Sequence, residues 1–355
     1  MFVAWRDLRF ARGRFALVLA VVGLITMLVV LLSGLTQGLG RDSTSAVTGL
    51  AADRVVLAHG GPGEAVTFAT SSLDAGRVDG WKSAPGVQSV APLGISTTPG
   101  KGSRTATVTT IGVPGDSKLA AGRTVAAGSV VLSTGAAESL CGDEPCRTVQ
   151  VAGQDLEVAA VSGDASYSHM PVVWMELSDW HGLPGAAGRT TALAVDVADS
   201  VDLAALDAKL STVSHTPQEA RVAVPSYSSE NGSLQMMRAL LFGISALVVG
   251  AFFTVWSMQR TGDVAVLKAL GASTAYVLRD AVAQSAIVLA LGVGAGALVA
   301  TGLGLAARNT VPLVLDAQTL LVPALITVAL GLAGAALSVL RVARVDPLIA
   351  LGASR

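Results

Sequence analysis

Charge is scarce in this 355-residue sequence: only 14% of its residues are Asp, Glu, Lys or Arg, whereas 52% are hydrophobic. In soluble domains, about a quarter of the residues are charged. Together with a mean hydropathy of +0.61, this composition excludes an ordinary soluble protein. We therefore expect a membrane protein, with the lipid bilayer as a partner and no nucleic-acid partner.

Signatures of catalysis and of metal binding are also missing. Residues 94–103 are the nearest approach to a phosphate loop, but five residues separate Gly94 from Gly100 where that loop has four, and Gly102 follows Lys101 in place of Ser or Thr. The four histidines have neither metalloprotease spacing nor a nucleophile elbow. We expect no enzyme activity, no metal site and no covalently bound cofactor.

Cysteine is limited to Cys141 and Cys146, within the stretch CGDEPC. Two thiols are too few for a metal site without nearby ligands, and a pair flanking Gly-Asp and Pro is typical of a small closed loop. A disulfide is favoured over two free thiols if the segment faces an oxidising exterior.

Four stretches without any charged residue are present: residues 15–40, 239–259, 281–307 and 317–340. Each reaches the roughly 20 residues that cross the hydrocarbon of a bilayer, so four transmembrane helices are predicted. The first could instead be a signal peptide, but it is longer than a signal h-region and lacks a clear cleavage site. Because ionisable residues are missing from all four stretches, an ion-coupled carrier is not indicated.

Lys and Arg predict the orientation. The segments that flank the apolar stretches at residues 1–14, 260–280 and 341–355 contain Lys and Arg, and the positive-inside rule places these segments in the cytoplasm. Residues 41–238 then lie outside the plasma membrane, and 308–316 form a short outer loop. The charge balance agrees with this orientation. Residues 41–238 contain 13 basic and 20 acidic side chains, whereas the remainder contains 11 basic and 5 acidic ones.

The large insert is predicted to be an α+β domain. Apolar, β-branched runs predict strands, residues 201–213 have helical spacing, and glycine- and proline-rich stretches at 60–63 and 99–102 predict loops. The predicted strands are residues 54–58, 105–113, 130–133, 156–162, 172–175 and 192–197, with a further extended run at 222–224.

A charged strip at residues 259–274 separates two of the apolar stretches. Val264, Val266, Leu267 and Leu270 have helical spacing, and Gly271 is the residue type that ends a helix in the left-handed conformation. Ser273 or Thr274 would cap the next helix. The strip is therefore predicted to be a short amphipathic helix that docks on a partner. Two glycine pairs, Gly34 with Gly38 and Gly292 with Gly296, fit close helix packing within one subunit or between two.

The order of these segments resembles the permease subunits of MacB/FtsX-type ABC transporters. The loop VAVLKALGAS (residues 264–273) and the tail RVARVDPLIALGA (residues 341–353) are similar to motifs of that family. The resemblance implies a coupling helix that sits in a groove of a separate cytoplasmic ATPase, and a complex of two permeases with two ATPases that bind the ATP. The coupling residues would be Asp263, where many members have Glu, and Val266, Leu267, Lys268, Leu270 and Gly271.

Within the family, SGLTQGLGRDSTSAVTGLAADRVVLA (residues 33–58) and SYSHMPVVWM (residues 166–175) resemble the DevC/HrtB branch, which includes haem-efflux permeases and glycolipid exporters. Haem iron accepts His, Met, Tyr or Cys as axial ligands. The candidate substrate-binding residues are Tyr227, Glu230, Tyr167, His169, Met27 and Met236. Plainer roles are packing for Met27, an interfacial position for Met236 and a turn for His169.

Two classes of function fit this resemblance. The first is ATP-driven export of a lipophilic cargo from the membrane, with haem as the expected cargo and a lipid, glycolipid or drug as alternatives. The second is an FtsX-like transmitter that regulates an extracellular cell-wall hydrolase, because one fold can serve both. A membrane-bound enzyme ranks third, since no nucleophile, base and orienting group are evident.

Overall fold

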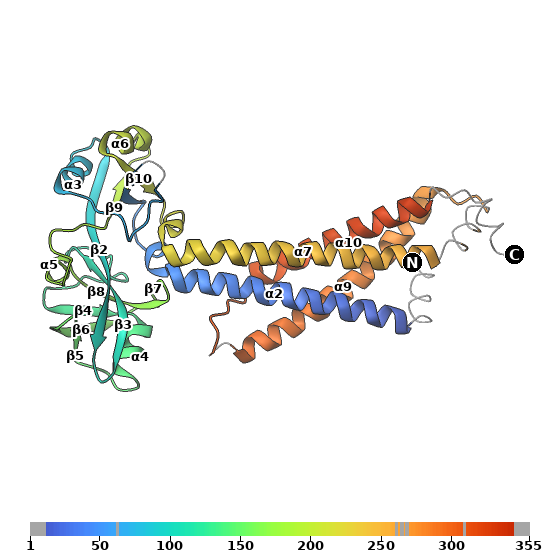
Figure 1. Cartoon of the computed structure of the whole chain (residues 1–355), viewed down its shortest axis with the longest axis horizontal. Helices are drawn as coiled ribbons and strands as arrows, with labels where there is room; N and C mark the ends of the chain where they lie inside the picture. The colour runs from blue at the N-terminus through green and yellow to red at the C-terminus, as the bar shows by residue number, and fades with distance from the viewer. Residues whose placement is uncertain are drawn as a thin grey trace. The chain divides into compact units, whose positions relative to one another are not determined.

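The computed structural model describes residues 12–61, 64–259, 262, 266, 270–307 and 310–343. The chain divides into two compact units. The first, called here the membrane unit, consists of Met1–Gly38 and Ser233–Arg355, and the second, the inserted domain, is Leu39–Gly232 (Figure 1).

The membrane unit is built from the four longest helices: α2 (Arg12–Thr48), α7 (Pro225–Gln259), α9 (Thr274–Ala307) and α10 (Ala317–Ala343). Each contains a segment long and apolar enough to cross a membrane. All four contribute to one core, which includes Val22, Phe253, Leu289 and Ala335. The predicted fold class, four transmembrane helices with an α+β domain between the first and second, is confirmed.

Helices α2 and α7 are longer than the stretches without charge, and their far ends belong to the inserted domain. Charge-free stretches mark only the residues that suit hydrocarbon, whereas a helix in water continues for as long as its backbone and packing support it. Helix α7 begins at Pro225, where the missing N–H of proline leaves no hydrogen bond unmade.

The two glycine pairs pack within one subunit. A Cβ on Gly296 would overlap the carbonyl of Gly23, which shows that α9 lies directly against α2. A Cβ on Gly38 would overlap the carbonyl of Pro312, in the connection between α9 and α10. The N–H of Val314 donates to the carbonyl oxygen of Gly34 at 3.1 Å, so this connection is held along α2.

The inserted domain contains one mixed sheet with the strand order β10-β1-β9-β2-β3-β8-β4-β6-β5, and β7 pairs with β8 beside it. The strands are β1 (Arg54–Ala58), β2 (Val87–Lys101), β3 (Thr105–Val113), β4 (Ser129–Leu132), β5 (Thr148–Val151), β6 (Gln154–Val161), β7 (Ser166–Tyr167), β8 (Met170–Glu176), β9 (Ala192–Val197) and β10 (Thr212–His215). The helices are α3 (Ala75–Lys82), α4 (Thr134–Cys141), α5 (Leu177–His181), α6 (Leu203–Leu210) and the 3-10 helix η1 (Ala220–Ala223).

Strand β2 joins two lobes because its two halves have different partners. Its first half pairs with β9, and from Gly94 onward it pairs with β3. Gly100 and Lys101 also pair with β5, which closes β2, β3, β8, β4, β6 and β5 into a ring (Figure 1). Ring closure removes exposed strand edges, which are otherwise sites of unwanted pairing.

Helix α5 packs on the ring through Trp180, which is almost fully buried. Its indole lies over Gly94 and Gly112, which face each other across β2 and β3, and a Cβ on either glycine would overlap the ring. The indole N–H donates to Ser96 Oγ at 3.0 Å. Residues 94–101, which belong to the nearest approach to a phosphate loop in the sequence, are strand.

A disulfide joins Cys141, at the end of α4, to Cys146, shortly before β5. The cross-link closes a loop with a sequence separation of 5. Short loops restrict the unfolded chain least, so this bridge fixes a local turn more than the whole domain.

Three predictions within the domain are wrong in part: the loop at 99–102, the end of the helix at 201–213 and the extended run at 222–224. Residues 99–101 are strand, because the β2–β3 turn lies further along, where the N–H of Gly102 donates to the carbonyl of Arg104. Helix α6 ends at Leu210, since Ser211 adopts a left-handed φ of 52° and Val213 then pairs with Leu57 in a strand. The run 222–224 is largely the end of η1.

Candidate functional site

A two-residue turn between β7 and β8 positions a polar side chain with several hydrogen-bond partners, His169. Ser168 and His169 form this turn, with φ values of 52° and 61°. Two successive residues with positive φ match the right-handed twist of a hairpin, and His is one of the side chains enriched in this conformation. The turn therefore presents the imidazole of His169 away from the hairpin.

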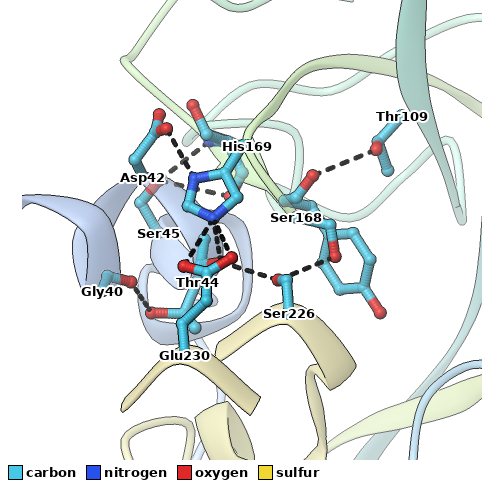
Figure 2. A network of polar contacts seen from close by, with 12 residues as sticks. Gly40, Asp42, Thr44, Ser45, Thr109, Ser168, His169, Ser226 and Glu230 are labelled. Atoms are coloured by element: carbon cyan, nitrogen blue, oxygen red, sulfur yellow. Dashed lines mark hydrogen bonds and ion pairs between the residues drawn. The ribbon is translucent and has the colours of Figure 1, made fainter. Parts of the chain in front are cut away.

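The imidazole lies between two carboxylates from different helices (Figure 2). Its Nδ1 is 2.9 Å from Asp42 Oδ2, near the end of α2, and its Nε2 is 3.0 Å from both oxygens of Glu230, near the start of α7. The hydroxyl of Ser43 is also 3.1 Å from Nε2. One side chain thus contacts the β7–β8 turn, α2 and α7 together.

The charge state of His169 follows from these neighbours. Burial lowers the pKa of the imidazole, whereas its hydrogen bonds to Asp42 and Glu230 and their negative charges raise it, and the net effect is a raised pKa. Its side chain keeps 29% of its surface exposed, so water weakens the ion pairs. An imidazolium suits the site because both of its nitrogens are donors.

Hydroxyl groups reinforce the same junction. Ser226 Oγ on α7 is 2.7 Å from Ser43 Oγ and donates to Ser168 Oγ at 3.1 Å. The backbone N–H of Ser168 donates to the carbonyl of Ser43 at 2.9 Å, and the N–H of Ser166 donates to Ser45 Oγ at 2.8 Å. We call Asp42, Ser43, Ser168, His169, Ser226 and Glu230 the His169 network.

The structure brings together two of the predicted haem ligands. His169 and Glu230 are in direct contact, which leaves neither imidazole nitrogen free for iron. Tyr167 is buried against Phe68, and burial raises the pKa of its phenol, which disfavours a phenolate ligand. The ring of Tyr227 packs under the guanidinium of Arg221, 5.4 Å from its centroid.

Met27 and Met236 belong to the membrane unit. Met27 is partly buried in α2, and Met236 is 67% exposed on α7. Among the described residues, we find no group of three or more His, Cys, Asp or Glu side chains that could hold a metal ion.

An apolar groove of about 650 Å³ opens on the membrane unit. Side chains from α2, α7, α9 and the α9–α10 connection line it, and all of them are apolar: Leu28, Leu31, Leu32, Leu35, Met237, Leu240, Leu241, Leu303, Gly304, Ala307, Val311 and Leu313. The next methionine after Met236, Met237, is the one that lines the groove. Such a surface suits a lipophilic molecule of moderate size.

The predicted coupling residues fall mostly outside the described part of the chain. This holds for Asp263, Leu267 and Lys268, and for the tail motif beyond Ala343. Val266 and Leu270 are described, both are exposed, and the N–H of Leu270 donates to the carbonyl of Val266 at 3.0 Å, as in a helix. Gly271 has a φ of +94°, and Ser273 Oγ accepts from the N–H of Tyr276 at the start of α9.

These features define a class: a membrane protein with four long apolar helices, three of which line an apolar groove, and an α+β domain between the first and second helices. The sequence pattern of the MacB-like periplasmic core domain matches residues 15–213, and that of the FtsX-like permease C-terminal region matches residues 236–347. The chain belongs to the MacB/FtsX-type family of ABC-transporter permeases.

Relatives of known sequence match along the whole chain. A putative hemin transport system permease protein HrtB of Staphylococcus epidermidis is 24% identical over 357 residues, covering 99% of both chains. The protein of the same description from Staphylococcus haemolyticus is 24% identical over 359 residues, again with 99% coverage of each. An uncharacterized ABC transporter permease of Mycobacterium bovis is 25% identical over 366 residues, with the same coverage.

Solved structures align with about half of the chain. The periplasmic region of MacB from Actinobacillus actinomycetemcomitans aligns with a TM-score of 0.38 and 15% identity, over 48% of this chain and 92% of that one.

Proposed function

We propose that this permease is the membrane subunit of an ATP-driven exporter that removes a lipophilic cargo from the bilayer, and that the cargo is haem. In the working complex, two copies of the chain pair with two cytoplasmic ATPase subunits, which bind and hydrolyse the ATP. The termini and residues 260–280 face the cytoplasm, and the inserted domain faces the outside of the plasma membrane. The distribution of Lys and Arg supports this orientation.

The apolar groove is the observation that carries the cargo class. Its α2 residues, 28–35, lie in the part of the span that is far from the basic N-terminal segment, and its α7 residues are near the beginning of that span. In the proposed orientation, both positions are in the outer leaflet. An apolar molecule dissolved in that leaflet can enter the groove sideways without crossing a polar barrier.

Two observations favour haem within this class. The relatives named as hemin transport permeases match along 99% of the chain, although at 24% identity. The groove also contains the thioether of Met237, which belongs to a class of axial ligand that haem iron accepts. In this proposal, the groove holds the macrocycle and Met237 is the first ligand to test.

A pair of leucines on α7 tests the groove. Leu241 lines it, whereas Leu247 is 72% exposed on the same helix and does not. An amide in an apolar site costs about 1–3 kcal/mol, so Leu241→Asn should weaken cargo binding and lower the haemin concentration that cells tolerate. Leu247→Asn, with the same change of chemistry, should leave haemin tolerance at the wild-type level.

The test compares cells that lack the gene with the same cells carrying wild-type, Leu241→Asn or Leu247→Asn protein at equal abundance. If deletion leaves haemin tolerance and cell-associated haem unchanged, haem is not the cargo. Recovery of an extracellular cell-wall hydrolase with the intact inserted domain would then support the transmitter function. Stimulation of ATP hydrolysis by another amphiphile would support export of a different lipid-like cargo.

A further inference from the structure

The two carboxylates of the His169 network can both be bonded only if each nitrogen of the imidazole carries a proton. Ionised carboxylates accept hydrogen bonds and cannot donate them, so the bonds to Asp42 and to Glu230 each need an N–H on the imidazole. The imidazolium has two N–H groups, whereas the neutral ring has one donor and one acceptor. At 2.9 Å and 3.0 Å, a lone pair on either nitrogen would face carboxylate oxygen.

We propose that His169 is a protonation-controlled positioning residue: as an imidazolium it holds the end of α2 to the start of α7, and as a neutral imidazole it releases Glu230. This inference rests on the proposed function in one respect, namely the ATP-driven cycle, in which we infer that α2 and α7 transmit movement. The two helices are suited to this role, since each is continuous between the membrane unit and the inserted domain.

Ser43 determines which carboxylate is released. Its hydroxyl is 3.1 Å from Nε2, the same nitrogen that contacts Glu230, and a hydroxyl can donate to a neutral ring nitrogen. When Nε2 loses its proton, Ser43 replaces Glu230 as its partner, and Nδ1–H keeps its bond to Asp42. The bridge therefore opens on the α7 side and stays closed on the α2 side.

The direction of the pH effect follows from the groups that contact the ring. Asp42 on α2 and Glu230 on α7 are the charged side chains bonded to it, and the other members of the network contribute hydroxyls. Because the pKa of His169 is raised, the bridge is complete in acidic conditions and is lost as pH rises through that raised value. The released state is thus the alkaline one.

Distance measurements between the two helices test the proposal in the purified full-length chain. The sequence has only two cysteines, and they are bonded to each other, so Ala51→Cys and Ser229→Cys provide unique sites for spin labels. Ala51 follows α2, Ser229 is on α7, and both are exposed in the inserted domain. We expect a narrow distance distribution at low pH and a broader or longer one at high pH.

Variants separate positioning from simple structural support. His169→Gln should give the broad distribution at all pH values, and Asp42→Asn should move the transition to lower pH. Glu230→Gln should give the narrow distribution at all pH values, because its amide can donate to the neutral ring as well as accept from the imidazolium. Ser43→Ala should move it to higher pH, because the neutral ring loses its replacement partner. The matched control His181→Gln, whose imidazole contacts the carbonyl of Arg189, should leave the transition in place.

Protonation can be followed directly as a second measurement. The chain has four histidines, so His169→Gln identifies the His169 signal in a spectrum of imidazole-labelled protein. We expect its titration midpoint above the ordinary value of 6.5. A midpoint at or below 6.5, or a distance distribution that does not change with pH, overturns the proposal.

Neither measurement involves cargo, ATP or the ATPase. A negative result would therefore remove the His169 mechanism and leave haem export untouched. Conversely, unchanged haemin tolerance after gene deletion would remove the cargo assignment, and His169 would still account for the pH-dependent distance change.

Discussion

Single residues without side chains determine how closely parts of the membrane unit approach one another. Gly38 is the sharpest case, because the carbonyl of Pro312 occupies the space that a Cβ would need. Gly302 is its counterpart within α9, where a Cβ would meet no atom within 4 Å. Substitution by alanine should therefore have opposite effects on stability at the two glycines.

Gly38→Ala should lower the stability of the full-length protein, whereas Gly302→Ala should not. Overpacking costs about 1–3 kcal/mol, while alanine in a helix interior is favoured over glycine by roughly 0.5–1 kcal/mol. Thermal unfolding in detergent provides the comparison. Equal midpoints for the two variants would show that the α9–α10 connection moves away from α2 without cost.

The residues of the His169 network show what sequence reasoning reached and what it missed. His169 and Glu230 were candidates because His can ligate haem and Glu230 precedes a span, but their contact joins positions 61 residues apart. Asp42 and Ser226 carry no local signal of their own. Asp42 lies within a segment that resembles the DevC/HrtB branch, and only the fold of the hairpin gives this acidic side chain a partner.

At the scale of elements, patterns of hydrophobicity located whole helices and strands better than their ends. Residues 54–58, 105–113 and 192–197 agree with β1, β3 and β9. Strand β2 was missed because proline and glycine interrupt its sequence, and residues 99–102 were predicted to be a loop. Here tertiary packing decides: Gly94 makes room for Trp180, and Pro99 pairs with Thr107 at the ring.

The predicted coupling helix is the element with the most direct functional test. Leu270 is 80% exposed in the isolated chain, which is a costly position for a large apolar side chain in water. We expect it to be covered by the ATPase subunit. Leu270→Glu should place a charge in that contact and prevent co-purification of the ATPase, while Leu270→Met, which keeps the apolar contact, should retain it.

Membrane insertion serves as the internal control for these two variants. Both should reach the membrane in wild-type amounts, because Leu270 lies outside the four predicted spans. An ATPase that remains bound to the Leu270→Glu protein would contradict the coupling assignment.

For the whole molecule, composition was sufficient to predict a membrane protein, and the apolar stretches were sufficient to locate its four long helices and the domain between the first two. Cargo could not be predicted in the same way. The groove is assembled from α2, α7, α9 and the α9–α10 connection, and its leucines look the same in the sequence as those that face lipid. Which apolar side chains line a cavity is decided by helix packing, and no sequence pattern records it.

The orientation of the chain in the membrane is a prediction for the whole molecule, and labelling at two exposed positions tests it. Val161, in the inserted domain, is 51% exposed, and Leu270 is on the opposite side of the membrane if the positive-inside rule holds. Because Cys141 and Cys146 are bonded to each other, a cysteine introduced at either position is the only free thiol. In intact cells, a membrane-impermeant maleimide should label Val161→Cys and should label Leu270→Cys only after the membrane is permeabilised.

The reverse pattern would invert the topology and place the inserted domain in the cytoplasm. It would also remove the argument that the groove opens to the outer leaflet, since the leaflet assignment depends on the same rule.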